Sequence, residues 1–153
     1  MLSEQYSQEF IIFLKRYNDF YQDFVTLENG KFNAMTADDI TLIDDFVKKE
    51  QAFLLKSRGF ERERDCYMDK AKHSELTLRE FIPLLDTNFQ EKAKELFENL
   101  TTSLYALKDI NKRCNNLAEI RLHKVSKILN QNQNYTATTV PSKGSISTIS
   151  KKI

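Results

Sequence analysis

The N-terminal segment repeats apolar side chains, most of them aromatic, at alternating intervals of four and three. The repeat consists of Tyr6, Phe10, Phe13, Tyr17, Phe20, Phe24 and Leu27. This alternation places every member on one face of an α-helix and is typical of helices that pack together along their length. Ile12, Leu14 and Tyr21 widen the apolar face, as a helix in contact with two neighbours requires. We therefore predict a long first helix, which Gly30 either ends or weakens.

A second helix is predicted from the vicinity of Asp39 to about Lys72. Thr36 followed by Asp39 resembles a capping box placed ahead of apolar residues. Helical spacing then continues through Phe46, Val47, Phe53, Leu54, Phe60 and Tyr67. Gly59 costs roughly 1 kcal/mol relative to Ala inside a helix, which the packing of Phe53 and Phe60 can offset. The helix is therefore expected to run through this glycine.

The remaining apolar segments predict a short bridging helix and a third long helix. Thr77 and Glu80 suggest an N-terminal cap, and Pro83 prevents one long helix from continuing through this stretch. From about Asn88 to Gln131 apolar residues recur at helical spacing over about 40 residues, which corresponds to ~60 Å at ~1.5 Å per residue. Such a helix is covered most economically by pairing along the other two long helices.

These elements predict an all-α fold, namely an elongated antiparallel bundle of three long helices with a short bridging helix and a disordered C-terminal tail. Only three glycines and two prolines occur in the chain, which favours long helices over tight turns. We assign residues 1–131 to the helical bundle domain. Residues 132–153 are rich in Ser and Thr, carry lysines but no acidic residue, and are expected to form a flexible tail.

No pattern in the sequence points to catalysis, a cofactor or a metal. Cys66 and Cys114 form no recognisable ligand spacing with His73 and His123, and no Gly-rich phosphate loop can be written. We therefore expect a protein that is not an enzyme and needs no cofactor. The net charge of +1, with both signs interspersed over most of the chain, predicts no nucleic-acid partner. No apolar run is long enough to span a membrane, so stable membrane insertion is not expected either.

The end of the third long helix carries a wide apolar arc between Ile120 and Leu129. Ile120, Leu122, Val125, Ile128 and Leu129 together exceed what one neighbouring helix covers. The helical periodicity is compatible with two interpretations of this arc. The first helix or a second copy of the chain buries this arc, or the arc is a face for an amphipathic helix from a partner protein.

The order of these features resembles the FlgN family of flagellar export chaperones. The matching positions of the second helix are Asp39, Leu42, Lys49, Leu54, Glu61 and Arg64, and the segment SELTLREFIPLL is similar to the bridging segment of that family. Asn111, Asn115, Asn116 and Leu117 resemble its asparagine-marked stretch, and Tyr135 and Gly144 lie in a polar tail as in family members. The resemblance covers essentially the whole chain, although the helix seam is richer in Phe and Tyr than the family pattern.

The resemblance implies a cytoplasmic chaperone that binds the C-terminal amphipathic helices of hook-filament junction proteins. Such a chaperone prevents premature assembly and delivers its clients to the flagellar export gate. The residues predicted to bind the client are Asn115, Leu117, Ile120, Leu122, Val125, Ile128 and Leu129, and Tyr135 is predicted to contact the gate. The alternatives are a self-associating scaffold bundle and a chaperone for flagellin or the filament cap, and a homodimer stays open.

Overall fold

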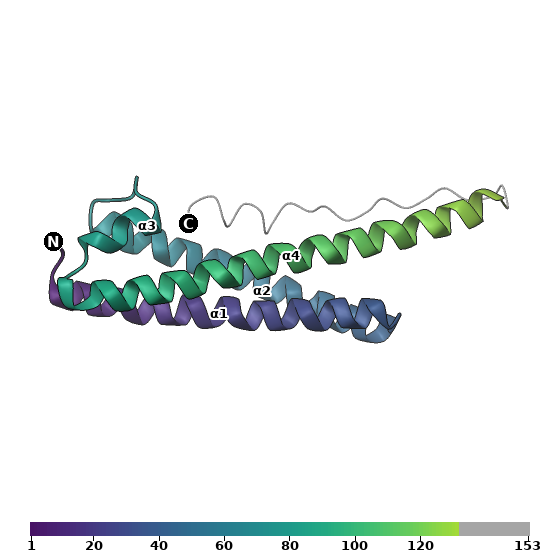
Figure 1. Cartoon of the computed structure of the whole chain (residues 1–153), viewed down its shortest axis with the longest axis horizontal. Helices are drawn as coiled ribbons and strands as arrows, with labels where there is room; N and C mark the ends of the chain where they lie inside the picture. The colour runs from purple at the N-terminus through teal and green to yellow at the C-terminus, as the bar shows by residue number, and fades with distance from the viewer. Residues whose placement is uncertain (132–153) are drawn as a thin grey trace.

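A computed structural model describes residues 1–131, and every regular element within this range is a helix (Figure 1). The three long helices are α1 (Glu4–Thr36), α2 (Ile40–Lys70) and α4 (Thr87–Gln131). Between α2 and α4 lie the short helix α3 (Leu78–Phe81) and the 3-10 turn η1 (Ile82–Leu84). The predicted all-α bundle is confirmed. The tail from residue 132, with Tyr135 and Gly144, lies outside the described residues.

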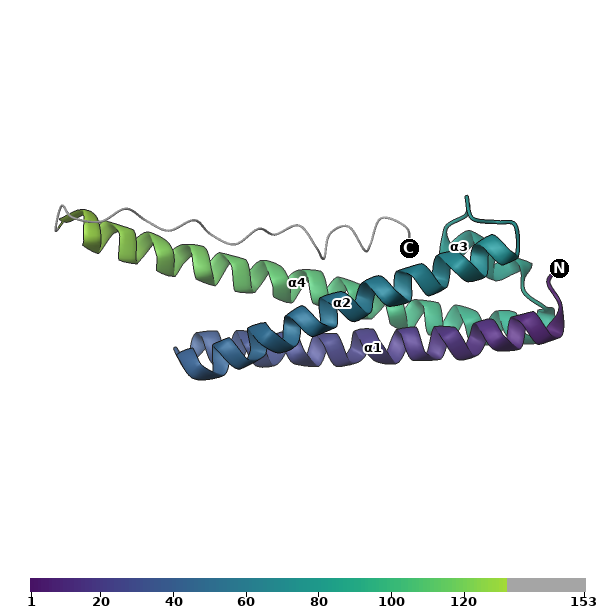
Figure 2. The same cartoon turned by 180° about the vertical axis from the view of Figure 1, so that it is seen from behind.

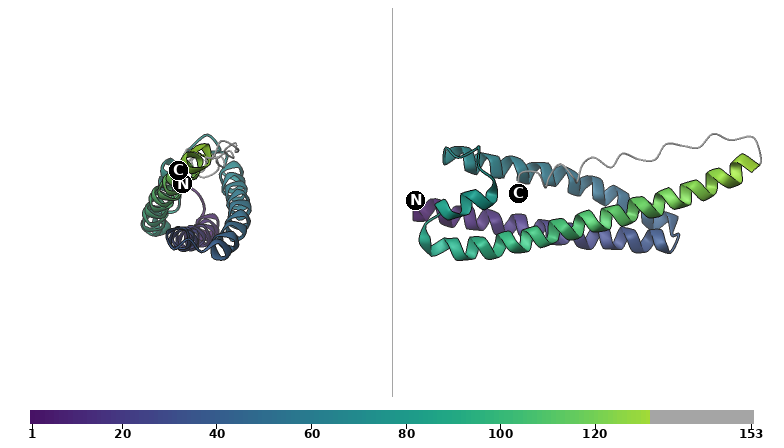
Figure 3. Two further views of the ribbon diagram at one scale, coloured as in Figure 1. Left: turned by 90° about the vertical axis from the view of Figure 1, so that its right-hand side faces the viewer. Right: turned by 45° about the horizontal axis from the view of Figure 1, so that its top comes forward.

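The bundle is elongated, and consecutive long helices run in opposite directions (Figure 1). Helices α1 and α4 therefore run the same way. Helix α1 packs against both α4 and α2, whereas α2 and α4 make little direct backbone contact within the described chain. Seen from behind, α2 runs obliquely across α1 (Figure 2). Along the long axis, the three long helices occupy the corners of a triangle (Figure 3).

The aromatic repeat of α1 forms the centre of the core, because this helix has a neighbour on two sides. Phe10, Phe13, Tyr17, Tyr21 and Phe24 are fully buried. Rings from α2 interleave with them: the centroids of Phe20 and Phe60 lie 4.9 Å apart, and those of Tyr17 and Phe60 lie 5.6 Å apart. Tilted and stacked ring contacts of this kind stabilise packing beyond area burial alone.

The short elements close the bundle at the end where α1 begins. Thr77 and Glu80 form the predicted capping box, in which Glu80 N–H donates to the Thr77 hydroxyl and Thr77 N–H donates to the Glu80 carboxylate at 2.8 Å. Pro83 lies in η1 and prevents α3 from continuing. Leu78, Phe81 and Leu85 are fully buried and cover the end of the core.

The predicted helix boundaries need two corrections. Thr36 does not cap α2, because it is the last residue of α1 and its hydroxyl donates to the Phe32 carbonyl at 2.9 Å. Asp39 is the N-cap instead, since its carboxylate accepts from the Leu42 N–H at 3.1 Å. Helix α2 ends at Lys70 rather than Lys72, and the left-handed φ of 62° at Lys72 is incompatible with helix.

Candidate binding face at the projecting end of α4

Helix α4 is longer than its two neighbours and projects past the turn that joins α1 to α2 (Figure 1). It contains 45 residues, compared with 33 in α1 and 31 in α2. Asp86 starts it, because its carboxylate accepts from the Asn88 N–H at 3.0 Å. Since α1 and α4 begin at the same end of the bundle, the extra turns of α4 extend beyond the end of α1. We call residues 122–131 the arm.

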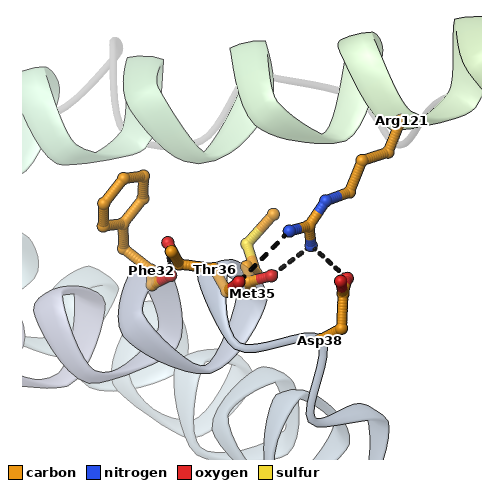
Figure 4. A network of polar contacts seen from close by, with 5 residues as sticks. All are labelled: Phe32, Met35, Thr36, Asp38 and Arg121. Atoms are coloured by element: carbon orange, nitrogen blue, oxygen red, sulfur yellow. Dashed lines mark hydrogen bonds and ion pairs between the residues drawn. The ribbon is translucent and has the colours of Figure 1, made fainter.

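Arg121 joins α4 to the end of α1, at the point where the arm begins (Figure 4). Its guanidinium Nη1 donates to the Met35 carbonyl and lies 2.8 Å from Asp38 Oδ1, while Nη2 lies 3.5 Å from the Thr36 carbonyl. The last carbonyls of a helix lack internal partners and carry partial negative charge. Arg121 therefore caps α1 from outside and connects its end to α4.

Burial along α4 falls at this contact. Cys114 is 3% exposed, and apolar residues of α4 before it are mostly buried against α1. Past Arg121, Val125 is 50% and Ile128 59% exposed, although both are apolar. Leu122 and Leu129 are half-buried. We call Leu122, Val125, Ile128 and Leu129 the arm stripe.

The arm stripe continues the seam by which α4 packs on α1. Leu100, Leu107, Cys114, Arg121 and Ile128 follow one another at intervals of seven, and all members before Arg121 are buried. A heptad interval returns a side chain to nearly the same face of a helix. Ile128 therefore faces the direction that α1 would occupy if α1 were longer, and the stripe is exposed because α1 ends at Thr36.

The structure divides the seven predicted face residues into three groups. Leu122, Val125, Ile128 and Leu129 come together in the arm stripe, while Asn115 and Leu117 precede Arg121 and are partly covered beside α1. Ile120 is 54% exposed, but it lies about 140° around the helix from Val125 at about 100° per residue. It therefore belongs to a different side of α4.

The arm is basic as well as apolar. Residues 122–131 contain His123, Lys124 and Lys127 and no acidic residue. Lys124 and Lys127 are exposed, and Lys124 borders the arm stripe about 40° from Ile128. The arm can therefore offer apolar contact and positive charge to the same partner.

A buried ionic cluster lies inside the bundle, away from the arm. Lys31 Nζ is 2.9 Å from Glu28 and also contacts Glu50, so one ammonium faces two carboxylates. Burial and a hydrogen bond with Glu50 raise the pKa of Glu28 to about 8. Burial opposes ionisation of Glu50 too, but its hydrogen bonds with Glu28 and Lys31 lower its pKa overall. Burial raises the pKa of the nearby Cys114 thiol to about 11, which keeps the thiol protonated and unreactive.

The described residues contain no group of three His, Cys, Asp or Glu side chains that could hold a metal ion. Within the same range, no helix is both long enough and apolar enough to cross a membrane. The fold and the arm together define a class of protein, an elongated helical bundle that presents a partly exposed apolar helix face.

The comparison with known families identifies the chain within this class. The family model described as FlgN protein matches residues 1–140, and the chain belongs to the FlgN family of flagellar export chaperones. This is a chaperone family rather than an enzyme family. No curated protein and no solved structure matches the chain.

Arg121 is the residue of this region that sequence reasoning did not single out. A signal for it exists, because Arg121 is the charged member of a heptad series that is otherwise apolar. A charged side chain at such a position indicates the end of a buried seam or a polar contact within it. The partner could not be found in the same way, since Met35 is 86 residues away in the chain.

Proposed function

We propose that this flagellar export chaperone binds the C-terminal amphipathic helices of hook-filament junction proteins on the arm stripe. Binding covers segments that otherwise associate, prevents their premature assembly in the cytoplasm, and allows their delivery to the export gate. The observation that carries the proposal is the arm stripe, because it continues a buried helix-packing seam beyond the last residue of α1. A partner helix placed there would pack against α4 as α1 does along the rest of the bundle.

Binding is favoured because both the client helix and the arm have an apolar face that lacks a packing partner. An amphipathic helix in isolation leaves its apolar face in water, and the arm stripe does the same. Each fully buried Val, Leu or Ile side chain contributes about 1.5–3 kcal/mol, and this burial has to exceed the cost of ordering the client segment. The predicted gate contact of Tyr135 lies outside the described residues and remains a prediction from the resemblance.

The test is calorimetric titration of the full chain with C-terminal fragments of the junction proteins. We expect saturable binding by the wild type and at least ~100-fold weaker binding by Val125→Asp/Ile128→Asp, because each change buries a carboxylate against apolar surface. Ile120→Asp is the matched control, since Ile120 is equally exposed on the same helix but lies off the stripe. Circular dichroism should show that all variants keep the wild-type helix content.

Binding that the double variant retains in full would place the client elsewhere. Equal loss in Ile120→Asp and in the double variant would show that the whole circumference of α4 is involved, rather than the stripe. If fragments of flagellin or the filament cap bind and junction-protein fragments do not, the alternative client class is correct. Absence of binding to all of these fragments would favour the scaffold alternative.

A further inference from the structure

A second surface with exposed apolar residues lies close to the base of the arm, at the turn between α1 and α2. Ile40, the first residue of α2, is 81% exposed, and Leu42 is 42% exposed. Residues 32–47 contain Asp38, Asp39, Asp44 and Asp45 and no basic residue. All four aspartates are exposed. We call these six residues the acidic turn.

The acidic turn and the arm are opposite in charge and alike in apolar character. The arm carries lysines without any acidic residue, and the turn carries four aspartates, of which Asp44 pairs with Lys48 at 2.9 Å and Asp38 with Arg121 within the chain. Negative charge is therefore in excess at the turn. Both surfaces expose large aliphatic side chains that their own chain leaves in contact with water. The Arg121–Asp38 contact at 2.8 Å shows that a basic residue of α4 and an aspartate of this turn can pair directly (Figure 4).

We infer that the arm of one molecule binds the acidic turn of a second copy of this chain, and that the second copy binds back in the same way. A two-fold arrangement satisfies this geometry, because each molecule supplies one arm and one turn. In this arrangement the two arms lie side by side and run in opposite directions. The C-terminal end of each arm is then close to the base of the other arm. Ile128 and Lys124 of one copy then approach Ile40 and Asp44 of the other.

The size of these surfaces sets the strength of the association. The arm spans about 15 Å at ~1.5 Å per residue, so the interface is at the small end of specific interfaces. We expect a reversible dimer with a Kd on the order of micromolar. Because the arm stripe takes part in it, a client helix and the second copy compete for the same residues.

Charge exchange between the two surfaces tests the inference with the full chain. Lys124→Glu/Lys127→Glu makes the arm acidic, and Asp44→Lys/Asp45→Lys makes the turn basic. Each variant alone places like charges opposite one another in both contacts of the dimer. A mixture of the two restores opposite charges in both contacts, because each altered arm meets an altered turn and each native arm meets a native turn.

Sedimentation velocity over about 1–100 µM should show a concentration-dependent dimer for the wild type. Each variant alone should remain monomeric, and an equimolar mixture should recover the dimer. Lys108→Glu/Lys112→Glu makes the same change of charge on the exposed side of α4 within the bundle and should dimerise like the wild type. Raising the salt concentration should weaken the wild-type dimer, since exposed charges are screened.

Two outcomes would overturn the inference. A wild-type chain that stays monomeric at every concentration has no such interface. Variants that fail to recover the dimer on mixing, while circular dichroism shows intact helix, would show that the arm and the turn do not meet. Neither outcome affects the proposed function, which the titration with junction-protein fragments decides separately.

Discussion

At the scale of single residues, the two glycines within the described helices have opposite surroundings. A Cβ atom at Gly59 would meet no atom within 4 Å, whereas a Cβ at Gly30 would lie 2.6 Å from ring carbons of Phe46. Neither glycine has a positive φ, so neither is required by backbone conformation. Gly30 is explained by the close approach of the Phe46 ring from α2, and nothing in the described chain explains Gly59.

This contrast predicts opposite effects of the same substitution. Gly59→Ala should raise the free energy of unfolding by about 1 kcal/mol, because alanine favours helix and nothing obstructs its methyl group. Gly30→Ala should lower it by about 1 kcal/mol, because displacement of the Phe46 ring outweighs the helix preference. Urea denaturation followed by circular dichroism measures both. Stabilisation by both substitutions would mean that the Phe46 ring moves at little cost.

The raised pKa of Glu28 predicts how the free energy of unfolding depends on pH. Its pKa rises from the usual value of 4.5 to about 8 in the folded chain, so folding favours its protonated form. The stability contributed by this group is fully present below about pH 4.5 and is lost as the pH rises toward about 8. Glu28→Gln imitates the protonated side chain and does not titrate. As the pH rises from about 4.5 to about 8, the free energy of unfolding of this variant should therefore increase relative to that of the wild type.

Denaturation curves at several pH values from about 3 to about 9 provide the measurement, because this range covers the titration of both glutamates. Glu50→Gln is the matched comparison, because the pKa of Glu50 is lowered and its ionised form is the stabilising one. That variant should be less stable than the wild type above pH 4.5, with the difference shrinking as the pH falls below it. A difference between Glu28→Gln and the wild type that is constant over the whole range would contradict the assignment of a raised pKa.

At the scale of elements, α4 is one continuous helix with two environments. Its first part is covered by α1, and the arm is covered only in part. Most of the stability of a helix in water comes from the packing of its apolar face rather than from helix propensity. The two parts should therefore differ in their resistance to local opening.

Amide hydrogen exchange should show this difference directly. We expect strong protection from Leu96 to Cys114 and fast exchange in the arm, with the change close to Arg121. Arg121→Ala should move the start of fast exchange toward Cys114 and lower global stability by only about 1 kcal/mol, because its ion pair is partly exposed. Arg113→Ala is the control, since Arg113 pairs with Asp109 on the same helix. Uniform protection along α4 would show that the arm is as stable as the bundle.

At the scale of the whole molecule, α1 is the shared partner of the other two long helices. The bundle is held together by this one helix, whose buried rings contact α2 and α3. Loss of a central ring such as Phe13 should therefore destabilise the entire bundle, as large-to-small changes in a core do. The proposed client-binding surface, by contrast, lies beyond the end of α1, where it continues the seam along which α4 packs on α1.

Local sequence patterns are sufficient to predict the helices of this chain and the direction of their apolar faces. The aromatic repeat from Tyr6 to Leu27 predicted α1, and the cap at Thr77 with Pro83 predicted the short bridge, because these signals are local and depend on helical period and backbone chemistry. The boundary at Thr36 was predicted incorrectly, since Thr36 and Asp39 are both plausible caps and only their hydrogen bonds distinguish them.

Which part of α4 is covered depends on how the helices are arranged in three dimensions. Leu107 and Ile128 occupy the same heptad position, yet Leu107 is buried and Ile128 is exposed. The difference depends on how far α1 extends beside α4, which is set by the turns between the helices and by contacts such as Arg121 with Met35 across 86 residues. A periodic pattern specifies the face of a helix that prefers to be buried, and the axial offset between helices specifies how much of that face is buried.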